Sequence, residues 1–472
     1  MGSISGTVKD ASGGVIPGAT VTLTNEGTGQ SISTTSLSVG EYTFSPVKIG
    51  HYSVSAEIKG FQKVKQNNVT VDVQQKVVVD FALPVGKSIE TVIVDAAPPA
   101  LQTQEASVGQ VVEAEAINAL PLNGRNFTFL AQLSAGVTQG QQDTRGLGAS
   151  GSFAANGLRP AQNNYLLDGM DNNTNLVDFL NGTAYVVRPP VDAIQEFKVE
   201  TNDYSAETGR AAGAVLNATI KSGTNQFHGS AWEFIRNDKL DAANFFENAG
   251  GIPKGRYQQN QFGVTIGGPI RHNKTFFFAD YEGTRIRQAL TSTNTVPTAL
   301  ERSSGYTNLS ELLTQGGTYA PDALGRTFPL GQVFDPSTTR GVTCGVADPV
   351  TGITAPCTGV PAGTQLGFVR EPFNGNMIPA NRLDQNAIKL LNLFPPPTNS
   401  NLFNNYAADP VSNNNTDQFD VRVDHSFSDK DNIFGRFSYV DNPSLIPGPF
   451  GGIADGGSFS DGIQTSKSLN AV

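Results

Sequence analysis

Residues 417–427 read DQFDVRVDHSF and contain the pattern that decides the fold. Apolar and polar side chains alternate along this stretch, so they lie on opposite faces of an extended strand. One face carries Phe419, Val421, Val423 and Phe427, and the other carries Gln418, Asp420, Arg422 and Asp424. A strand of a soluble sandwich also alternates, but here the polar face is charged and the apolar face is rich in aromatic residues. These are properties of a transmembrane β-barrel strand whose polar face lines the lumen.

Neighbouring stretches extend this pattern into a series of barrel strands. In the first of them, Phe262, Val264 and Ile266 share the apolar face. We expect five strands in all, and a sixth that begins near residue 466. The turns are short at one end, and the connection 289–415 at the other end is long, as periplasmic turns and extracellular loops are. The further alternating stretches are residues 259–268, 275–288 and 432–440.

Residues 1–85 are predicted to form a small β-sandwich. Short strands alternate there with turns at a spacing of about 8–12 residues, which is typical of sandwiches. Residues 40–61, GEYTFSPVKIGHYSVSAEIKGF, resemble the carboxypeptidase regulatory-like domain, a sandwich of the transthyretin type. This resemblance implies a fold and says nothing about catalysis.

Residues 86–100 are interpreted as a linker that contains one isolated strand. Thr91 to Val94 are four β-branched residues in a row, the type of residue that best fits an extended strand. Glycine and proline residues flank this stretch, and no hairpin partner lies next to it in the sequence. Two interpretations stay open. The strand pairs with another protein, or residues 89–94 complete the preceding sandwich.

Residues 101–223 have the mixed pattern of a compact α+β domain. Residues 111–133 combine helical periodicity with a Pro-Leu break and an Asn-Gly turn. Residues 163–173 contain a short apolar strand that is closed by an Asp-Gly turn. Two further strands are predicted within residues 193–202 and 213–223.

The composition argues against several classes of protein. The chain has 472 residues, a formal net charge of -10 and 16% charged residues. A negative chain does not favour nucleic acid or an anionic membrane surface as a partner. No stretch approaches the ~18 apolar residues of a transmembrane helix. Because no signal peptide follows Met1, we expect the chain to be cytosolic or to lack its true start.

The two cysteines, Cys344 and Cys357, lie in a loop that is rich in glycine, proline and threonine. This loop lacks the further cysteine or histidine pair that a zinc site needs. We favour a disulfide that closes the loop over two free thiols. Such a disulfide would place the loop in an oxidising compartment.

We find no catalytic, cofactor-binding or metal-binding constellation in the sequence, and we do not expect an enzyme. Residues 146–151, GLGASG, fit G-x-G-x-x-G but lack the flanking strand and helix of a dinucleotide-binding motif. Residues 168–173, DGMDNN, break the spacing of a calcium loop, so we interpret them as a surface turn. The four histidines are scattered, and no serine lies in a G-x-S-x-G motif.

The order of sandwich, isolated strand, α+β domain and barrel strands resembles the TonB-dependent outer-membrane receptors. Among these it resembles the Oar-like branch, which carries a carboxypeptidase regulatory-like domain at its front. The resemblance covers nearly the whole chain. It implies a plug domain over residues 101–223 and the start of an outer-membrane β-barrel over residues 224–472. The motifs that carry it are residues 120–127, 156–173 and 194–225 of the plug and residues 370–397 of a loop.

The resemblance also implies partners and a location. It places the chain in the cell outer membrane, with the N-terminal sandwich in the periplasm and lipid around the barrel. It implies a large extracellular solute of unknown identity and no cofactor. The sequence ETVIVDA resembles a TonB box, so the implied contacts of the periplasmic domain of TonB are Glu90, Thr91, Val92, Ile93, Val94, Asp95 and Ala96.

Two functions follow from these features. The first is a transporter that moves a large solute across the outer membrane and is energised through TonB. The alternative is a surface adhesion or assembly protein that uses the barrel as an anchor. Plugged transporters close with about 22 strands, and an open barrel edge is costly in lipid. We therefore expect this mainly β chain to be a fragment whose barrel is incomplete.

Overall fold

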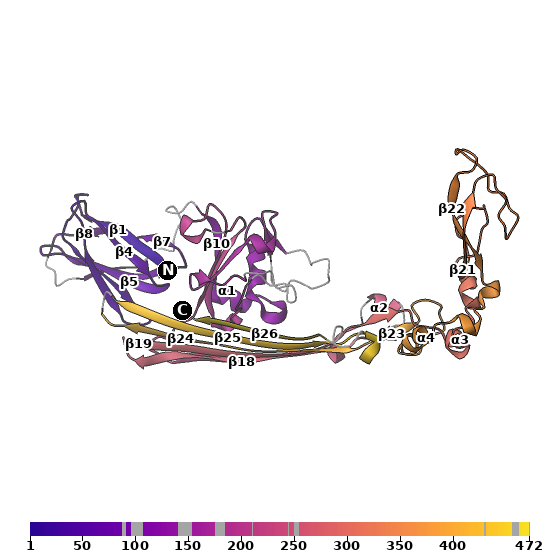
Figure 1. The fold of residues 1–472 in the computed structure, drawn as a ribbon. Coiled ribbons are helices and arrows are strands. Elements are labelled where there is room, and N and C mark those ends of the chain that lie inside the picture. Colours follow the sequence, from indigo (N-terminus) through magenta and orange to yellow (C-terminus); the bar gives the residue numbers. More distant parts are fainter. Residues whose placement is uncertain are drawn as a thin grey trace.

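The computed structural model describes a mainly β chain, as the sequence predicts, and no helix within the described residues is long and apolar enough to cross a membrane. It is built from three parts that follow one another in the chain (Figure 1). The described residues are 1–86, 91–95, 107–139, 153–174, 185–209, 211–243, 245–249, 254–428, 431–455 and 462–471.

The N-terminal domain consists of two facing sheets whose alternating apolar residues meet in one core. One sheet has the order β3-β2-β5-β6-β9, and in the other β1 lies between β4 and the pair β7 and β8. Val21, Leu23 and Val54 are completely or almost completely buried between the sheets. The strands are β1 (Gly2–Asp10), β2 (Thr20–Asn25), β3 (Ser31–Thr35), β4 (Glu41–Val47), β5 (Gly50–Glu57), β6 (Lys63–Val71), β7 (Lys76–Val78), β8 (Phe81–Leu83) and β9 (Thr91–Asp95).

The middle domain is built on a five-stranded mixed sheet of the order β10-β15-β16-β13-β14. Its core contains Ile117, Tyr165 and Phe197, which expose 2% or less of their surface. The 7-residue segment Phe127–Leu133 covers this core as a 3-10 helix. The elements are β10 (Val108–Glu113), α1 (Ala114–Ala119), β11 (Val137–Gln139), β12 (Phe153–Ala155), β13 (Asn164–Leu167), β14 (Met170–Asp171), β15 (Ile194–Asn202) and β16 (Val215–Ile220).

The C-terminal part contains an antiparallel sheet of the order β17-β18-β19-β24-β25-β26. It includes every alternating stretch from which barrel strands are predicted. The strands are 10 to 16 residues long, and no turn interrupts them. Their bounds are β17 (His228–Asn237), β18 (Tyr257–Arg271), β19 (Thr275–Ala289), β24 (Val411–Ser426), β25 (Asn432–Ile446) and β26 (Gly462–Ala471).

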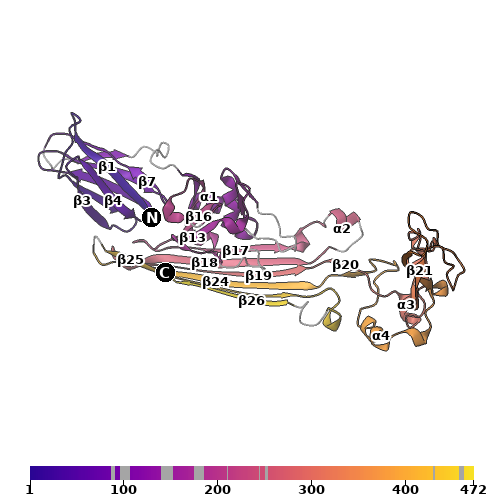
Figure 2. The ribbon, with the colours of Figure 1, turned by 45° about the horizontal axis from the view of Figure 1, so that its top comes forward.

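The two faces of this long sheet differ in chemistry. On β24, Asp420, Arg422 and Asp424 are buried, whereas Val421 and Val423 between them are 40% and 39% exposed. The N-terminal and middle domains both lie on the same side of the sheet (Figures 1 and 2). Phe278 of β19 is part of the core of the middle domain, so the charged face is the covered one.

The connection between β19 and β24 has its own structure and extends away from the sheet (Figure 1). It forms two small antiparallel ribbons, β20 with β23 and β21 with β22. Residues 411–415, which we expected in this connection, belong to β24 instead. The remaining elements of the C-terminal part are α2 (Phe245–Ala249), β20 (Ser292–Asn294), α3 (Ala299–Ser303), β21 (Phe334–Thr343), β22 (Gln365–Pro372), α4 (Gln385–Leu391) and β23 (Tyr406–Ala408).

Candidate functional site

The strand that resembles a TonB box lies at the edge of the N-terminal domain. β9 pairs in parallel with β6 over five residue pairs, from Lys63 with Thr91 to Asn67 with Asp95. The structure therefore agrees with the second of the two interpretations, in which this stretch completes the preceding sandwich, and it contradicts a strand without a partner in its own chain. The edge of β6 offers unpaired backbone groups, and an adjacent β-branched segment satisfies them. Glu90 and Ala96, the two ends of the expected box, lie outside the described residues.

One long edge of β9 carries no neighbouring strand among the described residues, because β9 is the last strand of its sheet. Val92 is 38% exposed and Ile93 is 64% exposed. An edge strand of this kind can accept a further strand through its main chain. β9 can therefore pair with β6 along one edge while its other edge stays exposed.

Asp168 is the centre of the contact between the middle domain and the long sheet. It follows β13 in a two-residue turn with Gly169, and both residues have positive φ angles, of 54° and 79°. Asp-Gly is a preferred pair for this hairpin turn because both residues tolerate the left-handed conformation. The Asp-Gly turn is confirmed, and Gly169, Met170 and Asp171 are exposed, but the Asp168 side chain is only 3% exposed.

Two arginines of the long sheet hold the Asp168 carboxylate. Arg422 Nη1 on β24 donates to Asp168 Oδ1 at 3.0 Å, and Arg436 Nε on β25 donates to Asp168 Oδ2 at 2.8 Å. The backbone N–H of Ile220 also donates to Oδ1, at 3.1 Å. Removing water from charges is costly, so such a buried group is stable only when every partner is present.

The ion pairs continue from Arg422 to the N-terminal domain. Arg422 Nε donates to Asp424 Oδ2 at 2.9 Å, and Lys48 Nζ donates to Asp424 Oδ1 at 2.9 Å. Lys48 lies in the turn between β4 and β5. The members of this group, which we call the Asp168 cluster, are Lys48, Asp168, Arg422, Asp424 and Arg436.

A second contact joins the middle domain to the first strand of the long sheet. Arg125, from the segment LPLNGRNF, forms an ion pair with Asp192 of the same domain. Its guanidinium group lies 4.2 Å from the centre of the Phe234 ring and 5.8 Å from that of Trp232, both on β17. Cations are attracted to aromatic ring faces at such distances. The sequence identifies this segment as part of the middle domain but does not indicate this role.

The N-terminal and middle domains also contact each other directly. The backbone N–H of Val73 donates to the Glu196 carboxylate on β15. Burial, followed by the nearby charge of Asp72, raises the pKa of Glu196 to about 8. Burial is also the main cause of the raised pKa of Asp72.

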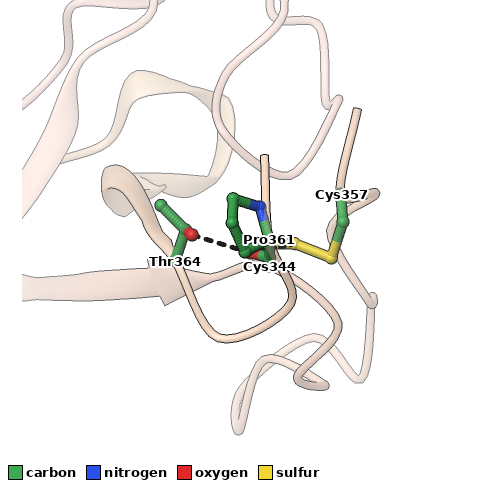
Figure 3. The surroundings of a disulfide bond; sticks show 4 residues. All are labelled: Cys344, Cys357, Pro361 and Thr364. Carbon is green, nitrogen blue, oxygen red and sulfur yellow. Dashed lines mark hydrogen bonds between the residues drawn. A yellow bond between two sulfur atoms is a disulfide. The ribbon is translucent and has the colours of Figure 1, made fainter. Parts of the chain in front are cut away.

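The predicted disulfide is present and joins Cys344 to Cys357 (Figure 3). The Cα atoms of the two residues are 5.0 Å apart. The backbone N–H of Cys344 donates to the Thr364 carbonyl at 2.8 Å. Thr364 Oγ1 donates to the Pro361 carbonyl at 2.7 Å, which fixes the neighbouring turn. The disulfide therefore stabilises the end of the β21–β22 ribbon.

Ion pairs fix the base of the same ribbon. Arg326 Nη1 and Arg340 Nη2 both donate to Glu371, and Arg340 Nε donates to Asp348 at 2.5 Å. The hydrogen bonds from Arg340 hold the pKa of Asp348 well below its usual range. Within the described residues, no three His, Cys, Asp or Glu side chains lie close enough to hold a metal ion.

Comparisons with known proteins agree with this architecture. The family model "Outer membrane beta barrel domain" matches residues 219–472, which is more than half of the chain. The model "Carboxypeptidase regulatory-like domain" matches residues 3–84. A curated relative, the TonB-dependent transporter Oar of Myxococcus xanthus, is 27% identical over 257 residues, which cover 51% of this chain and 23% of that protein. The chain thus spans about a quarter of the length of this relative.

Two solved structures align with this chain at lower sequence identity. The outer membrane transporter YddB of Escherichia coli aligns over 72% of this chain and 34% of its own, with 11% identity and a TM-score of 0.39. A ferric enterobactin receptor of Pseudomonas aeruginosa aligns over 78% of this chain and 46% of its own, with 13% identity and a TM-score of 0.35.

The two family models together account for the sandwich at the front and for the long sheet behind it. The curated relative is a TonB-dependent transporter. The chain therefore belongs to the outer membrane β-barrel family, carries a carboxypeptidase regulatory-like domain in front of the barrel strands, and is similar to the TonB-dependent transporter Oar.

Proposed function

We propose that the full-length receptor moves a large solute across the outer membrane and is energised through TonB. The middle domain serves as the plug of a barrel to which this chain contributes the first strands, and further strands complete it. The observation that carries this proposal is the Asp168 cluster, which attaches the middle domain to the charged face of the long sheet. No cofactor and no covalent chemistry are part of the proposal.

The orientation of the sheet follows from its two faces and its two ends. The apolar face with Val264 and Val421 contacts lipid, and the charged face lines the lumen, as in other transmembrane barrels. The turn between β18 and β19 comprises only residues 272–274, whereas residues 290–410 connect β19 to β24. Because periplasmic turns are short and extracellular loops are long, the N-terminal domain lies in the periplasm and the connection outside.

TonB would bind at β9. A strand of its periplasmic domain adds to the outer edge of β9, so that main-chain hydrogen bonds supply the affinity. The box residues Glu90 to Ala96 remain our candidates for this contact. The pairing with β6 changes the proposal in one respect. TonB would bind a strand that is already part of the N-terminal sheet, and not an isolated strand in a linker.

Cross-linking between β9 and TonB tests this proposal. Ile93→Cys places a thiol on β9 at a position that is 64% exposed, and Leu37→Cys places one elsewhere in the same domain at a position that is 62% exposed. Cells would express either variant together with a TonB that carries a cysteine in its periplasmic strand. We expect a disulfide-linked product with Ile93→Cys alone. Equal yields at both positions would show that β9 is not the contact.

The second candidate function, surface adhesion or assembly, is favoured by the connection between β19 and β24. It extends away from the sheet (Figure 2). On it, Phe368 and Val346 are 69% and 54% exposed. Adhesion needs no energy from the inner membrane. Cells that lack TonB should therefore still adhere if this function is the main one, whereas transport of the solute should be lost.

A further inference from the structure

The N-terminal domain contacts both of the parts that would have to separate during transport. It bonds to the middle domain through Val73 and Glu196. It also bonds to the segment that leads into β17, where Asn225 Nδ2 donates to the Thr28 carbonyl at 2.7 Å and the Asn225 N–H donates to the Gly27 carbonyl at 3.1 Å. The N-terminal domain therefore packs directly against the rest of the chain (Figure 2). We call this contact the seat, and its residues are Gly27, Thr28, Val73, Glu196 and Asn225.

Lys48 connects this seat to the Asp168 cluster. Arg422 is shared between two carboxylates, with Nε and Nη2 directed to Asp424 and Nη1 directed to Asp168. Lys48 supplies Asp424 with a second cation. Without Lys48, Asp424 would depend on Arg422 alone, and its attraction for Arg422 would compete with that of Asp168. The side chains of Asp424, Arg422 and Asp168 are 7% exposed or less, so water cannot replace the lost partner well.

We propose that the seated N-terminal domain keeps the middle domain closed against the barrel wall, and that Lys48 transmits this effect through Asp424 and Arg422 to Asp168. This inference rests on the proposed function, because it assumes that the middle domain is a plug. Removal of the N-terminal domain from its seat weakens the hold on Asp168. Force that TonB applies to β9 would have this effect, since β9 belongs to the N-terminal sheet.

The structure offers a reversible way to fix the domain in its seat. A Cβ atom on Gly27 would lie 4.0 Å from the Cβ of Thr224, the residue next to Asn225. This distance suits a disulfide. Gly27→Cys combined with Thr224→Cys would therefore tie the N-terminal domain to the start of the long sheet under oxidising conditions. A reductant would release it.

The experiment uses the purified full-length receptor in planar lipid bilayers, with potassium chloride conductance as the probe and urea added on the side of the N-terminal domain. We expect the oxidised Gly27→Cys/Thr224→Cys protein to open at a higher urea concentration than the reduced protein, which should match wild type under the same reductant. Lys48→Glu should open at least about fivefold faster than wild type at equal urea, because coupled sites usually change each other's equilibria by about fivefold or more. Lys59→Glu makes the same charge change at an exposed position of the same domain and should behave as wild type.

Asp168→Asn separates this inference from the proposed function. If the middle domain is a plug, Asp168→Asn opens the pore by itself, and Lys48→Glu adds little to it because both act through Arg422. If Asp168→Asn opens the pore but neither the disulfide nor Lys48→Glu changes the opening, the role of the N-terminal domain is overturned while the plug stands. If Asp168→Asn has no effect on conductance, the plug assignment is wrong, and the inference falls with it.

Discussion

The N-terminal domain and the long sheet use the same alternating pattern in opposite ways. In the N-terminal domain the apolar faces of two sheets meet, and Leu23 and Val54 are buried between them. In the long sheet the charged face is covered and the apolar face is exposed. Alternation therefore defines two faces, and the surroundings of the strand decide which of them is buried. The difference teaches that a buried position need not be apolar when its partner also supplies charges.

The charged contact should be the most sensitive part of this comparison. Asp168→Asn keeps the shape of the side chain but removes the ion-pair partner of buried Arg436 and one of the two carboxylates that pair with Arg422, which should lower the free energy of unfolding by ~3–5 kcal/mol. Urea titration of the receptor would measure this loss. As a control, Asp168→Leu combined with Arg422→Met and Arg436→Leu should cost less than Asp168→Asn, because both arginines are then removed together with their shared carboxylate and Asp424 keeps Lys48. A loss below about 1 kcal/mol for Asp168→Asn, as for an exposed ion pair, would indicate that water reaches the cluster.

The apolar core of the N-terminal domain should respond to volume rather than to charge. Leu23→Ala removes a side chain that is 1% exposed, and the loss of burial plus the cavity should cost roughly 2–5 kcal/mol. Thermal unfolding of the full chain, followed by circular dichroism, would record the transition of this domain. Val39→Ala removes an apolar side chain that is 55% exposed and is the matched control. Equal shifts for both variants would contradict the buried position of Leu23.

A charged substitution on the exposed face of the long sheet should lower the free energy of unfolding only in a lipid bilayer. Val421→Arg near the centre of the bilayer should cost about 2–4 kcal/mol, and less near either interface. Unfolding of the full-length receptor from lipid vesicles would measure this cost, with Val421→Leu as the control on the same face. Asp420→Arg on the opposite face is not a suitable control, because Asp420 does not tolerate substitution. Its carboxylate accepts a hydrogen bond from Ser438, and the residue is only 2% exposed. Similar results for Arg and Leu at position 421 would mean that this face does not contact lipid.

The contact between the N-terminal and middle domains should depend on pH. The pKa of Glu196 is raised from 4.5 to about 8 in the folded protein, so the folded state binds this proton more tightly than the unfolded state does. The resulting stabilisation is complete below about pH 4.5 and is lost as the pH rises through about 8. Glu196→Gln keeps an acceptor for the Val73 N–H and should cost no more than about 0.5–1.5 kcal/mol at low pH.

The melting temperature of wild type and Glu196→Gln, measured from pH 5 to pH 9, would test this expectation. The groups that act on Glu196 include Asp72, Glu113 and the amino group of Met1. Wild type should lose stability across this interval relative to Glu196→Gln. Parallel curves for the two proteins would show that Glu196 does not titrate there.

Several features of the fold could be predicted because they depend on neighbours in the sequence. The alternation along residues 417–427 predicts both faces of β24, and the Asp-Gly pair predicts the turn at Asp168. The β-branched run at Thr91 predicts that β9 is a strand. In each case, local side-chain direction or backbone preference determines the outcome.

The candidate site was mostly missed because its members are far apart in the chain. Asp168 was interpreted as part of a surface turn, although it pairs with Arg422, which lies 254 residues further on. One signal could have indicated the pairing. The arginines on the charged face of β24 and β25 need counter-ions from the domain that covers this face. A carboxylate at a hairpin turn of that domain can supply the negative charge. The sequence does not say which carboxylate that is.

The sequence by itself thus determined that β9 and β24 contain strands, which residues of β24 share a face and where the turn at Asp168 lies, because these properties follow from side-chain direction and backbone preference within a few residues. Only the tertiary structure decided what each face and edge meets. β9 pairs with β6 because unpaired backbone groups on the edge of a sheet take the strand that is available. Asp168 meets two arginines because folding brings two distant segments into a space from which water is excluded, where opposite charges must be paired.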